Sequence, residues 1–328
     1  MSGLVKSSRN GGKLYVLIAV LIVCIAVAAG LTFLGDSRTW QEESGAVFGT
    51  EYHIKYSAEK SFASLIEAEL KRVDETFSIF NPRSLVSRIN AGETDSMNSL
   101  LREVMVISRV VFDDTGGAFD PTVRPAVEAW GFGKAATPEL RPERIDSLRQ
   151  LIGFQKVDIL GNRLRLPRGM TLDFGAIAKG YAVDRVARLL QEHGVEDYMV
   201  EIGGEIRLLG CNPDGNPWQV GIVKPPKRGE DRLPELQPEL LSMTSGAVAT
   251  SGNYNNTRTI EGRRFSHTIN PLTASPQLSD VLSATVITDE CAVADAYATA
   301  FMVLGKEKSE RVLARKDSNS LRAILIAD

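Results

Sequence analysis

An uncharged, mostly apolar run covers residues 14 to 34 and separates a short N-terminal tail from the rest of the chain. The run is long enough for a helix to cross a lipid bilayer. Lys6, Arg9 and Lys13 precede it and Asp36 follows it, so the positive-inside rule predicts a cytoplasmic N-terminus. We therefore expect a cytoplasmic tail (1–13), a transmembrane anchor (14–34), a linker (35–46) and one exported domain (47–328).

Two other interpretations of this segment stay open. Ala26, Val27 and Ala28 have the small-x-small form of a signal-peptidase site, which would make the run a cleaved signal peptide. Cys24 could receive a lipid after cleavage, although Val23 before it is bulkier than that processing usually accepts. The apolar run continues beyond Ala28, which favours a retained anchor. All three interpretations export the rest of the chain.

The exported part mixes two periodicities. Apolar residues recur at helical spacing over 61–77, 101–112, the stretch after Gly180 and 291–304. Alternation and short apolar runs predict strands at 52–56, 156–160, 163–166, 198–202, 205–209, 218–223, 247–251, 266–269, 283–288 and 322–327. The proline-rich, charged stretch 224–240 is typical of a surface loop. Irregular interleaving with several hairpins predicts an α+β fold with mixed or antiparallel sheets and packed helices.

Residues 172–184 predict a strand end that runs directly into a helix. Asp173 closes the apolar lead-in, and Gly175 and Gly180 allow a ligand or another backbone to approach closely. Lys179 lies in the first turn of the predicted helix, where free backbone N–H groups favour phosphate. From this segment alone, a phosphate site and an ordinary strand–turn–helix corner are equally good interpretations.

Charge and cysteine content exclude other activities. The net charge is -3 and the basic residues form no stripe, so we expect no nucleic-acid partner. No Cys/His spacing indicates zinc. Cys211 and Cys291 could pair in an oxidising compartment, a question that the sequence leaves open.

Asp295 and Thr299 are one helical turn apart in the predicted C-terminal helix, so their oxygens project from one face. A carboxylate beside a hydroxyl suits a hard cation such as Mg²⁺, which takes few protein oxygens and leaves room for phosphate. Alternatively, the two side chains only cap their own helix. The many alanines around them permit a close neighbour, which favours the functional interpretation.

Two further segments carry candidate chemistry. Residues 116–123 and 130–133 combine glycine turns with aromatic side chains, a pattern that suits contact with a flat ring or a packed Ω-loop. His267 precedes a proline turn, where it could act as a general base, although a lone strand histidine is more often structural.

These segments, in this order, resemble the ApbE-type FAD:protein FMN transferases. The resemblance covers about residues 47 to 328, and so many segments in register exclude chance similarity. The matching segments are 48–50, 77–80, 87–90, 117–123, 130–133, 172–184, 200–205, 218–222, 249–252, 266–271 and 294–299.

The resemblance implies an enzyme that transfers FMN from FAD to a Thr or Ser hydroxyl of an acceptor protein and releases AMP. It implies Mg²⁺ at Asp295, Thr299 and the carbonyl of Ala176. Lys179 and Asp295 are implied in catalysis, and His267 is our candidate for activating the acceptor hydroxyl. The implied FAD-binding residues are Phe48, Phe80, Ala118, Phe119, Asp120, Asp173, Lys179 and Ile269.

The chain departs from the family pattern at three positions. Asn270 and Ala274 stand where the family usually has Asp and Gly, and Asn253 stands where Asp is common. Loss of two acids could alter acceptor recognition or metal number. Because Asp173, Lys179, Asp295 and Thr299 are all present, we expect an active enzyme.

Other functions remain to be tested against transfer. Water could replace the acceptor hydroxyl, which would make the chain a Mg²⁺-dependent FAD pyrophosphatase, or the chain could be an exported flavin-binding protein without catalysis. By resemblance, the acceptor would be a flavoprotein, for example a subunit of a membrane electron-transport complex. We expect a single-pass protein of the bacterial inner membrane with its catalytic domain on the periplasmic side.

Overall fold

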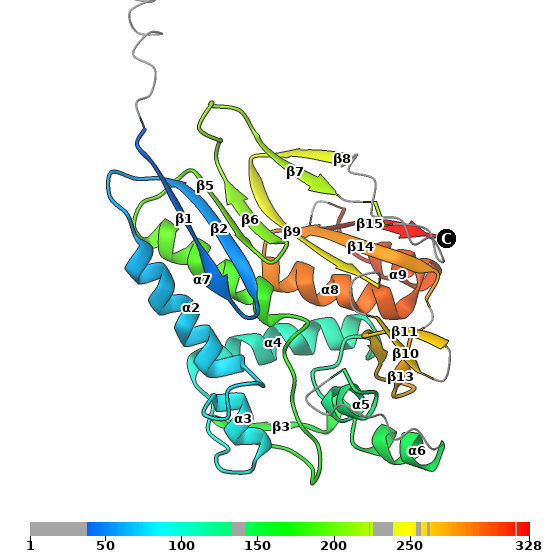
Figure 1. Ribbon diagram of the computed structural model, residues 1–328. Helices are drawn as coiled ribbons and strands as arrows, with labels where there is room; N and C mark the ends of the chain where they lie inside the picture. Colours follow the sequence, from blue (N-terminus) through cyan, green and yellow to red (C-terminus); the bar gives the residue numbers. More distant parts are fainter. Residues whose placement is uncertain are drawn as a thin grey trace, which may run out of the picture. The chain divides into compact units, whose positions relative to one another are not determined.

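The computed structural model describes residues 38–132, 142–222, 224–225, 239–253, 257–260, 263–277, 279–318 and 320–328. Its centre is a seven-stranded sheet in the order β1-β2-β5-β6-β9-β14-β15, and every pairing in it is antiparallel (Figure 1). The strands of this sheet are β1 (Trp40–Val47), β2 (Thr50–Ser57), β5 (Tyr198–Ile202), β6 (Glu205–Leu209), β9 (Ser245–Gly252), β14 (Val281–Thr288) and β15 (Leu321–Ala327).

Helices cover one face of the sheet, and a hairpin packs on the other (Figure 1). The long helices are α2 (Ala63–Phe77), α4 (Ser99–Asp114), α7 (Ala178–Glu192) and α8 (Cys291–Leu304). The shorter ones are α3 (Leu85–Asn90), α5 (Arg124–Ala129), α6 (Pro142–Gln150), α9 (Lys306–Leu313) and a 3₁₀ turn (Phe154–Lys156). The remaining strands pair as hairpins: β3 (Asp158–Leu160) with β4 (Arg163–Arg165), β7 (Trp218–Ile222) with β8 (Glu239–Met243), β10 (Thr257–Ile260) with β11 (Arg263–Ser266), and β12 (Ile269–Asn270) with β13 (Ser275–Pro276).

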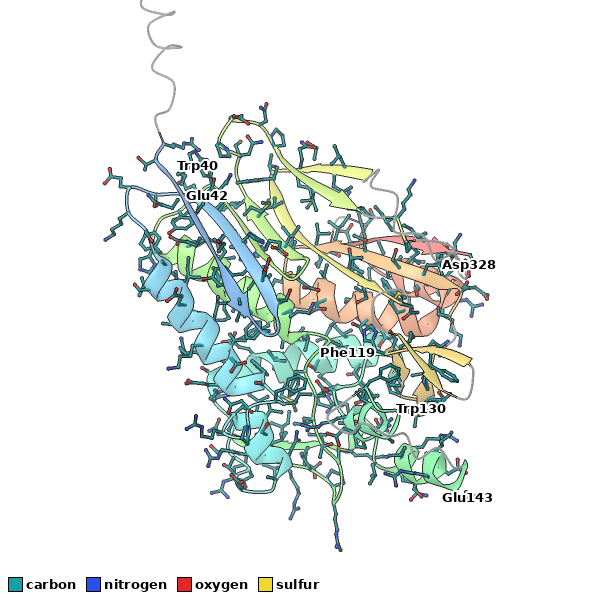
Figure 2. The ribbon with its side chains drawn as sticks, viewed as in Figure 1. Trp40, Glu42, Phe119, Trp130, Glu143 and Asp328 are labelled. Carbon is teal, nitrogen blue, oxygen red and sulfur yellow. The ribbon has the colours of Figure 1, made fainter. Side chains whose placement is uncertain are left out.

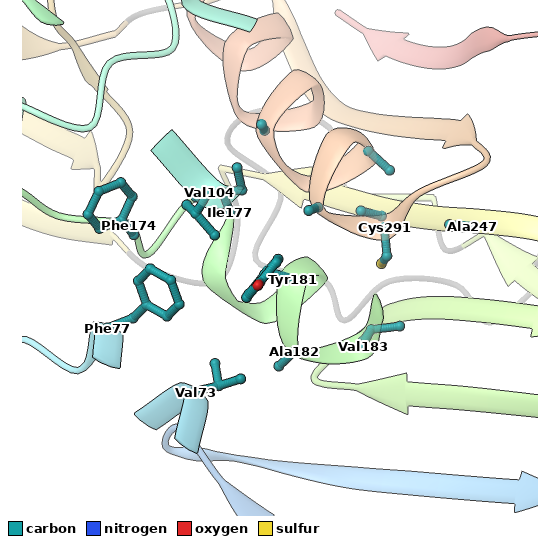
Figure 3. Close-up of a cluster of buried hydrophobic side chains, with 14 of the residues drawn as sticks. Val73, Phe77, Val104, Phe174, Ile177, Tyr181, Ala182, Val183, Ala247 and Cys291 are labelled. Atoms are coloured by element: carbon teal, nitrogen blue, oxygen red, sulfur yellow. The ribbon is translucent and has the colours of Figure 1, made fainter. Parts of the chain in front are cut away.

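Alternation along the strands explains the two faces. In β5 every second residue is buried, beginning with Tyr198, as expected for a strand with one face on a core. α7 brings its apolar residues onto this core, where Tyr181 packs edge-on against Phe77 at 5.7 Å between ring centroids (Figure 3). α8 is apolar nearly all round and is correspondingly buried along most of its length.

A close crossing between α7 and α8 fixes the start of α8. Both carboxylate oxygens of Asp184 accept hydrogen bonds from the first turn of α8, from Cys291 N at 2.9 Å and Ala292 N at 2.8 Å. Asp184 is fully buried and pairs with Arg207 of β6 at 2.6 Å. A carboxylate here satisfies N–H groups that the helix itself leaves unpaired. The cap therefore ties α8 to α7 and to the sheet.

The predicted α+β class is confirmed, and the sheet is antiparallel. Two predicted boundaries are wrong. Residues 40–46, which we assigned to the linker, form most of β1 because they pair along their length with β2. The strand predicted at 266–269 is interrupted at His267 and Thr268, where the chain leaves β11 before β12 begins.

Other predictions fall partly or wholly outside the described residues. The predicted tail and membrane anchor (1–34) lie outside them, as does most of the predicted loop 224–240, whose last two residues belong to β8. Among the described helices, none has the length and apolar character needed to cross a membrane. Cys211 and Cys291 are both free thiols, and the latter is buried.

Candidate active site

Four of the predicted FAD-binding residues line one cavity of about 490 Å³. They are Phe48, Phe80, Asp173 and Lys179, and they come from the β1–β2 turn, the segment after α2, and the junction that leads into α7. The rest of the lining is Gly49, Val73, Asp74, Phe77, Ser78, Ile79, Gly175 and Ala178. The cavity therefore combines aromatic walls with one cation and two acids.

Two phenylalanines form the aromatic walls, one with a strained backbone and the other with a solvent-exposed ring. Phe48 has φ +53° in the two-residue turn between β1 and β2, a left-handed conformation that is rare for a bulky side chain. Phe80 is 70 % exposed, the largest exposed fraction among the large hydrophobic side chains of the described residues. Strained or solvent-exposed apolar groups concentrate at functional sites. Both rings are therefore available to a flat, apolar ligand group.

The junction before α7 is held by side chains that bond to backbone. Asn90 accepts from Leu172 N at 2.7 Å and donates to Leu172 O at 2.8 Å. Asp173 Oδ1 accepts from Gly175 N at 2.8 Å, and desolvation raises the pKa of this carboxyl. In the first turn of α7, the Ala178 N–H already bonds to Phe174 O and the Gly180 N–H to Asp295. The Lys179 side chain is the charged donor that the junction offers to phosphate in this cavity.

Lys179 links the cavity to two buried acids. Its ammonium group forms an ion pair with Glu205, which begins β6, and Asp295 of α8 lies near enough to act on its charge. Burial favours the neutral amine, but Asp295 and Glu205 outweigh it and raise the pKa of Lys179. Glu205 and Asp295 are 3 % and 4 % exposed. Two buried acids therefore share one lysine, and negative charge would be in excess if both acids were ionised.

This arrangement perturbs both carboxyls. Burial, followed by the negative charge of Asp295, raises the pKa of Glu205 to about 8 against the opposing effect of Lys179. Burial also raises the pKa of Asp295, while Lys179 and the Gly180 N–H oppose the rise. Carboxyls perturbed in this way beside a cleft are typical of functional sites. An added cation would relieve the perturbation.

The raised pKa of Glu205 has a consequence for stability. The ordinary pKa of a glutamate is about 4.5, so Glu205 loses its proton above that pH in the unfolded chain but keeps it up to about pH 8 in the folded protein. The free energy of unfolding therefore falls as the pH rises from about 4.5 to about 8. We expect the melting temperature of the metal-free protein to fall between pH 6 and pH 8. This fall should be about 2–5 °C larger than the fall in the Glu205→Gln variant. Calorimetry in EDTA measures this difference. Parallel melting curves for the two proteins would show that Glu205 is ionised throughout.

Asp295 and Thr299 lie one turn apart in α8. Asp295 Oδ2 accepts from Gly180 N at 3.1 Å, and Thr299 Oγ1 lies 3.3 Å from Ser251 Oγ of β9. Within the described segments, no three His, Cys, Asp or Glu side chains converge as a complete metal cage. Mg²⁺ does not need one, since it is usually held by one or two carboxylates together with substrate phosphates and water. Hard oxygens and acids that an added cation would help to ionise therefore fit Mg²⁺, and the half-buried Ala176 remains its predicted carbonyl ligand.

The predicted residues 118–120 have buried side chains (Phe119 is labelled in Figure 2). Asp120 accepts from Thr122 through N and Oγ1, at 2.7 and 2.6 Å, and from Phe154 N at 3.1 Å. Its carboxylate therefore ties together the segments around it. None of residues 118–120 lines the 490 Å³ cavity, whereas Asp120 lines a second cavity of about 830 Å³, and their assignments to FAD binding stay predictions.

The segment that carries His267 lies outside this cavity. His267 is exposed and lines neither the 490 Å³ cavity nor the second cavity, of about 830 Å³, between Gly116, Lys156 and Leu272. Ile269 is buried in a small cluster with Trp130, which is labelled in Figure 2. The assignments of His267 and Ile269 likewise stay predictions.

The departures from the family pattern have local partners. Asn253 accepts from Thr268 Oγ1 at 2.8 Å, and Asn270 donates to Gln277 at 2.8 Å, which an aspartate could not do. Ala274 has φ +52°, the left-handed conformation that explains why the family usually has glycine there. Its carbonyl accepts from Trp130 Nε1 at 2.8 Å, so the surrounding structure holds the strained backbone in place.

We expect Ala274→Gly to change the free energy of unfolding by less than about 1 kcal/mol, because relief of about 1–2 kcal/mol of left-handed strain offsets the entropy of glycine and the loss of a fully buried methyl group. Denaturant titration measures the change. Ala91→Gly reports the entropy of glycine alone, since Ala91 is exposed and has φ −82°, and it should lose about 0.5–1 kcal/mol. A larger loss at Ala274 than at Ala91 would show that Ala274 is not strained.

One residue of the cluster is absent from our predicted site. Glu205 belongs to the matching segment 200–205, yet its order along the chain gives no sign that β6 begins beside Lys179. The available signal is a glutamate directly after two glycines at a hairpin turn. If that glutamate is buried, it is expected to have a partner, since glutamate is seldom buried without one.

Comparison with known proteins shows the family to which the chain belongs. A family model described as ApbE family matches residues 48–325. An FAD:protein FMN transferase of Vibrio cholerae is 35 % identical over 317 residues, 92 % of each chain. A protein of the same name from Haemophilus influenzae is 32 % identical and covers 93 % of this chain and 91 % of its own.

Solved structures show the same architecture. The flavin transferase ApbE of Vibrio cholerae superposes with a TM-score of 0.75 at 33 % identity, covering 88 % of this chain and 97 % of its own. The ApbE protein of Thermotoga maritima gives a TM-score of 0.77 at 28 % identity, covering 88 % and 94 %.

Proposed function

The chain belongs to the ApbE family and is a flavin transferase, and we propose that it binds FAD in the cavity lined by Phe48, Phe80, Asp173 and Lys179. It transfers FMN from FAD to an acceptor protein. One observation carries the proposed site: Lys179 lines the aromatic cavity and also pairs with the buried Glu205, near enough to Asp295 for that acid to act on its charge. A flavin nucleotide needs both environments, one for its rings and one for its pyrophosphate.

The reaction that we propose is a phosphoryl transfer. A Thr or Ser hydroxyl oxygen of the acceptor bonds to the phosphorus of the FMN half, and the P–O bond of the pyrophosphate breaks. AMP leaves with the bridging oxygen, and the hydroxyl proton passes to a base, for which His267 is the candidate. Little covalent chemistry is required of the protein, so positioning and charge stabilisation dominate.

The residues of the cluster divide this work. Lys179 places a positive charge beside the pyrophosphate. Negative charge increases on the phosphate of the leaving AMP during transfer, and the lysine stabilises it. Asp295, Thr299 and the carbonyl of Ala176 would hold Mg²⁺, which supplies Lewis-acid polarisation of phosphoryl oxygens when bound. Phe48 and Phe80 pack on a flat ring and orient the nucleotide.

The function is tested with the full-length protein, FAD, Mg²⁺ and an acceptor domain that carries an exposed Thr. Intact mass of the acceptor and released AMP are recorded, with EDTA as control. We expect the acceptor to gain the mass of one FMN with equimolar AMP, only in the presence of metal. AMP without labelling would indicate FAD hydrolysis, and bound FAD without either product would indicate a binding protein.

The N-terminal segment supports a location for this activity. A single-pass inner-membrane anchor, with the catalytic domain outside the cytoplasm, would account for two features of this segment. They are the apolar run 14–34 and the positive charges of Lys6, Arg9 and Lys13 before it. The acceptor would then be an exported or membrane flavoprotein, such as a subunit of an electron-transport complex. Protease added to spheroplasts should degrade the catalytic domain, and full protection would contradict this location.

A further inference from the structure

Glu205 reaches the cavity only through another side chain. It is 3 % exposed and does not line the cavity itself. One of its oxygens pairs with the Lys179 ammonium group, and the other, Oε2, is buried without a hydrogen-bond partner in the described part of the chain. A buried carboxylate with an unsatisfied oxygen is costly. Its presence beside the cavity therefore calls for an explanation other than stability.

The turn before β6 fixes the position of Glu205 independently of Lys179. Gly203 N donates to Glu51 O at 3.0 Å, which ties this turn to β2. Gly203 and Gly204 have φ +62° and +102°, and a Cβ on Gly203 would lie 2.8 Å from Thr50. The backbone position of Glu205 is thus fixed and its buried side chain has little room to move, whereas Lys179 has a flexible four-carbon side chain.

The pairing is not needed to dock α7 on β6. The same helix and strand are joined by Asp184 and Arg207 at 2.6 Å, and Asp184 also caps α8. A second buried ion pair adds little to stability, because desolvation offsets its Coulombic gain. What the second pair does provide is a defined place for the ammonium group.

We propose that Glu205 is a positioning residue, which holds the Lys179 ammonium group against the wall of the cavity so that it meets the FAD pyrophosphate. The inference rests on the proposed function of the cavity. Without Glu205, Lys179 would sample several rotamers and turn toward Asp295, and the charge beside the leaving phosphate would be lost for much of the time.

A double-mutant cycle with the full-length protein tests this proposal. Glu205→Gln is expected to lower kcat for FMN transfer about 10- to 100-fold, a typical cost of losing the group that orients an active-site residue. In a Lys179→Met background, the same substitution should change kcat by less than about twofold, since there is no amine left to position. Glu205→Asp should recover part of the activity. Glu69→Gln is the matched control: Glu69 is a buried acid paired with Arg185 at 2.6 Å outside the cavity, and its loss should leave kcat unchanged.

Equal losses from Glu205→Gln in both backgrounds would overturn the proposal, because Glu205 would then act independently of Lys179. An unchanged kcat in the single variant would overturn it as well. If the wild-type protein released no AMP, the proposed function would fail instead. The same cycle, measured on FAD dissociation constants by flavin fluorescence, would then decide the role of Glu205: coupling between the two substitutions supports it and additivity refutes it.

Discussion

Asp295→Asn is expected to lower FMN transfer by about 10³-fold and to leave the protein folded. Asparagine keeps an oxygen that can accept from Gly180 N but removes the charge that the proposed Mg²⁺ site requires, and loss of a metal contact at a phosphoryl group costs several kcal/mol of transition-state stabilisation. Because burial raises the pKa of Asp295, its ionised form does not favour folding, and the melting temperature should be unchanged or higher. Transfer rates at saturating Mg²⁺ and calorimetry measure the two effects.

Asp114→Asn is the matched control for this prediction. The Asp114 carboxylate bonds to Tyr297 of α8 and to Lys316. Partial burial opposes ionisation, but Lys316 and Tyr297 outweigh it and lower the pKa of Asp114, so this charge favours the folded state at neutral pH. Its loss should lower the melting temperature and leave transfer nearly intact. Full activity in Asp295→Asn would refute the metal assignment.

Gly180→Ala is expected to disrupt both the fold around α8 and the activity. A Cβ at this position would lie 2.3 Å from Cys291 O and 2.9 Å from Ala292 N, which are backbone atoms that cannot move aside. The two helices must separate, at a cost of about 3 kcal/mol, and Asp295 moves with α8. Displacement of a reacting group by about 1 Å can cost 10²-fold in rate, so transfer should fall by about that factor.

The sign of the stability change makes this test decisive. Within a helix, replacing glycine with alanine ordinarily stabilises by about 1 kcal/mol, because alanine has the higher helix propensity. A fall in melting temperature would therefore report the close crossing of α7 and α8. A higher melting temperature with normal transfer rates would show that the helices have room for a methyl group.

Much of this architecture follows from local patterns. The helix at 291–304 and the hairpin at 198–209 begin and end where apolar spacing and two glycines predict them. β1 was missed because Trp40–Val47 is polar at several positions and is specified by its pairing with β2. The break at His267 was missed for the opposite reason, since the residues around it favour a strand locally and the turn is set by contacts with Asn253 and Gln277.

The site divides in a similar way. The identities of Asp173, Lys179, Asp295 and Thr299 come from the resemblance, and the structure brings Lys179 and Asp295 together across the α7–α8 crossing. Glu205 follows two glycines at a hairpin turn, but that pattern does not show that β6 begins beside Lys179 of α7. Long-range packing of this kind leaves no periodicity in the chain.

Binding of FAD in the cavity between Phe48, Phe80 and Lys179 is tested by a crystal structure of the protein with FAD and Mg²⁺. We expect a flat ring of FAD against Phe80, the pyrophosphate within hydrogen-bond distance of Lys179 Nζ, and a metal bound to Asp295. FAD bound instead in the 830 Å³ cavity beside Leu272, with Lys179 distant from its phosphates, would contradict this binding mode.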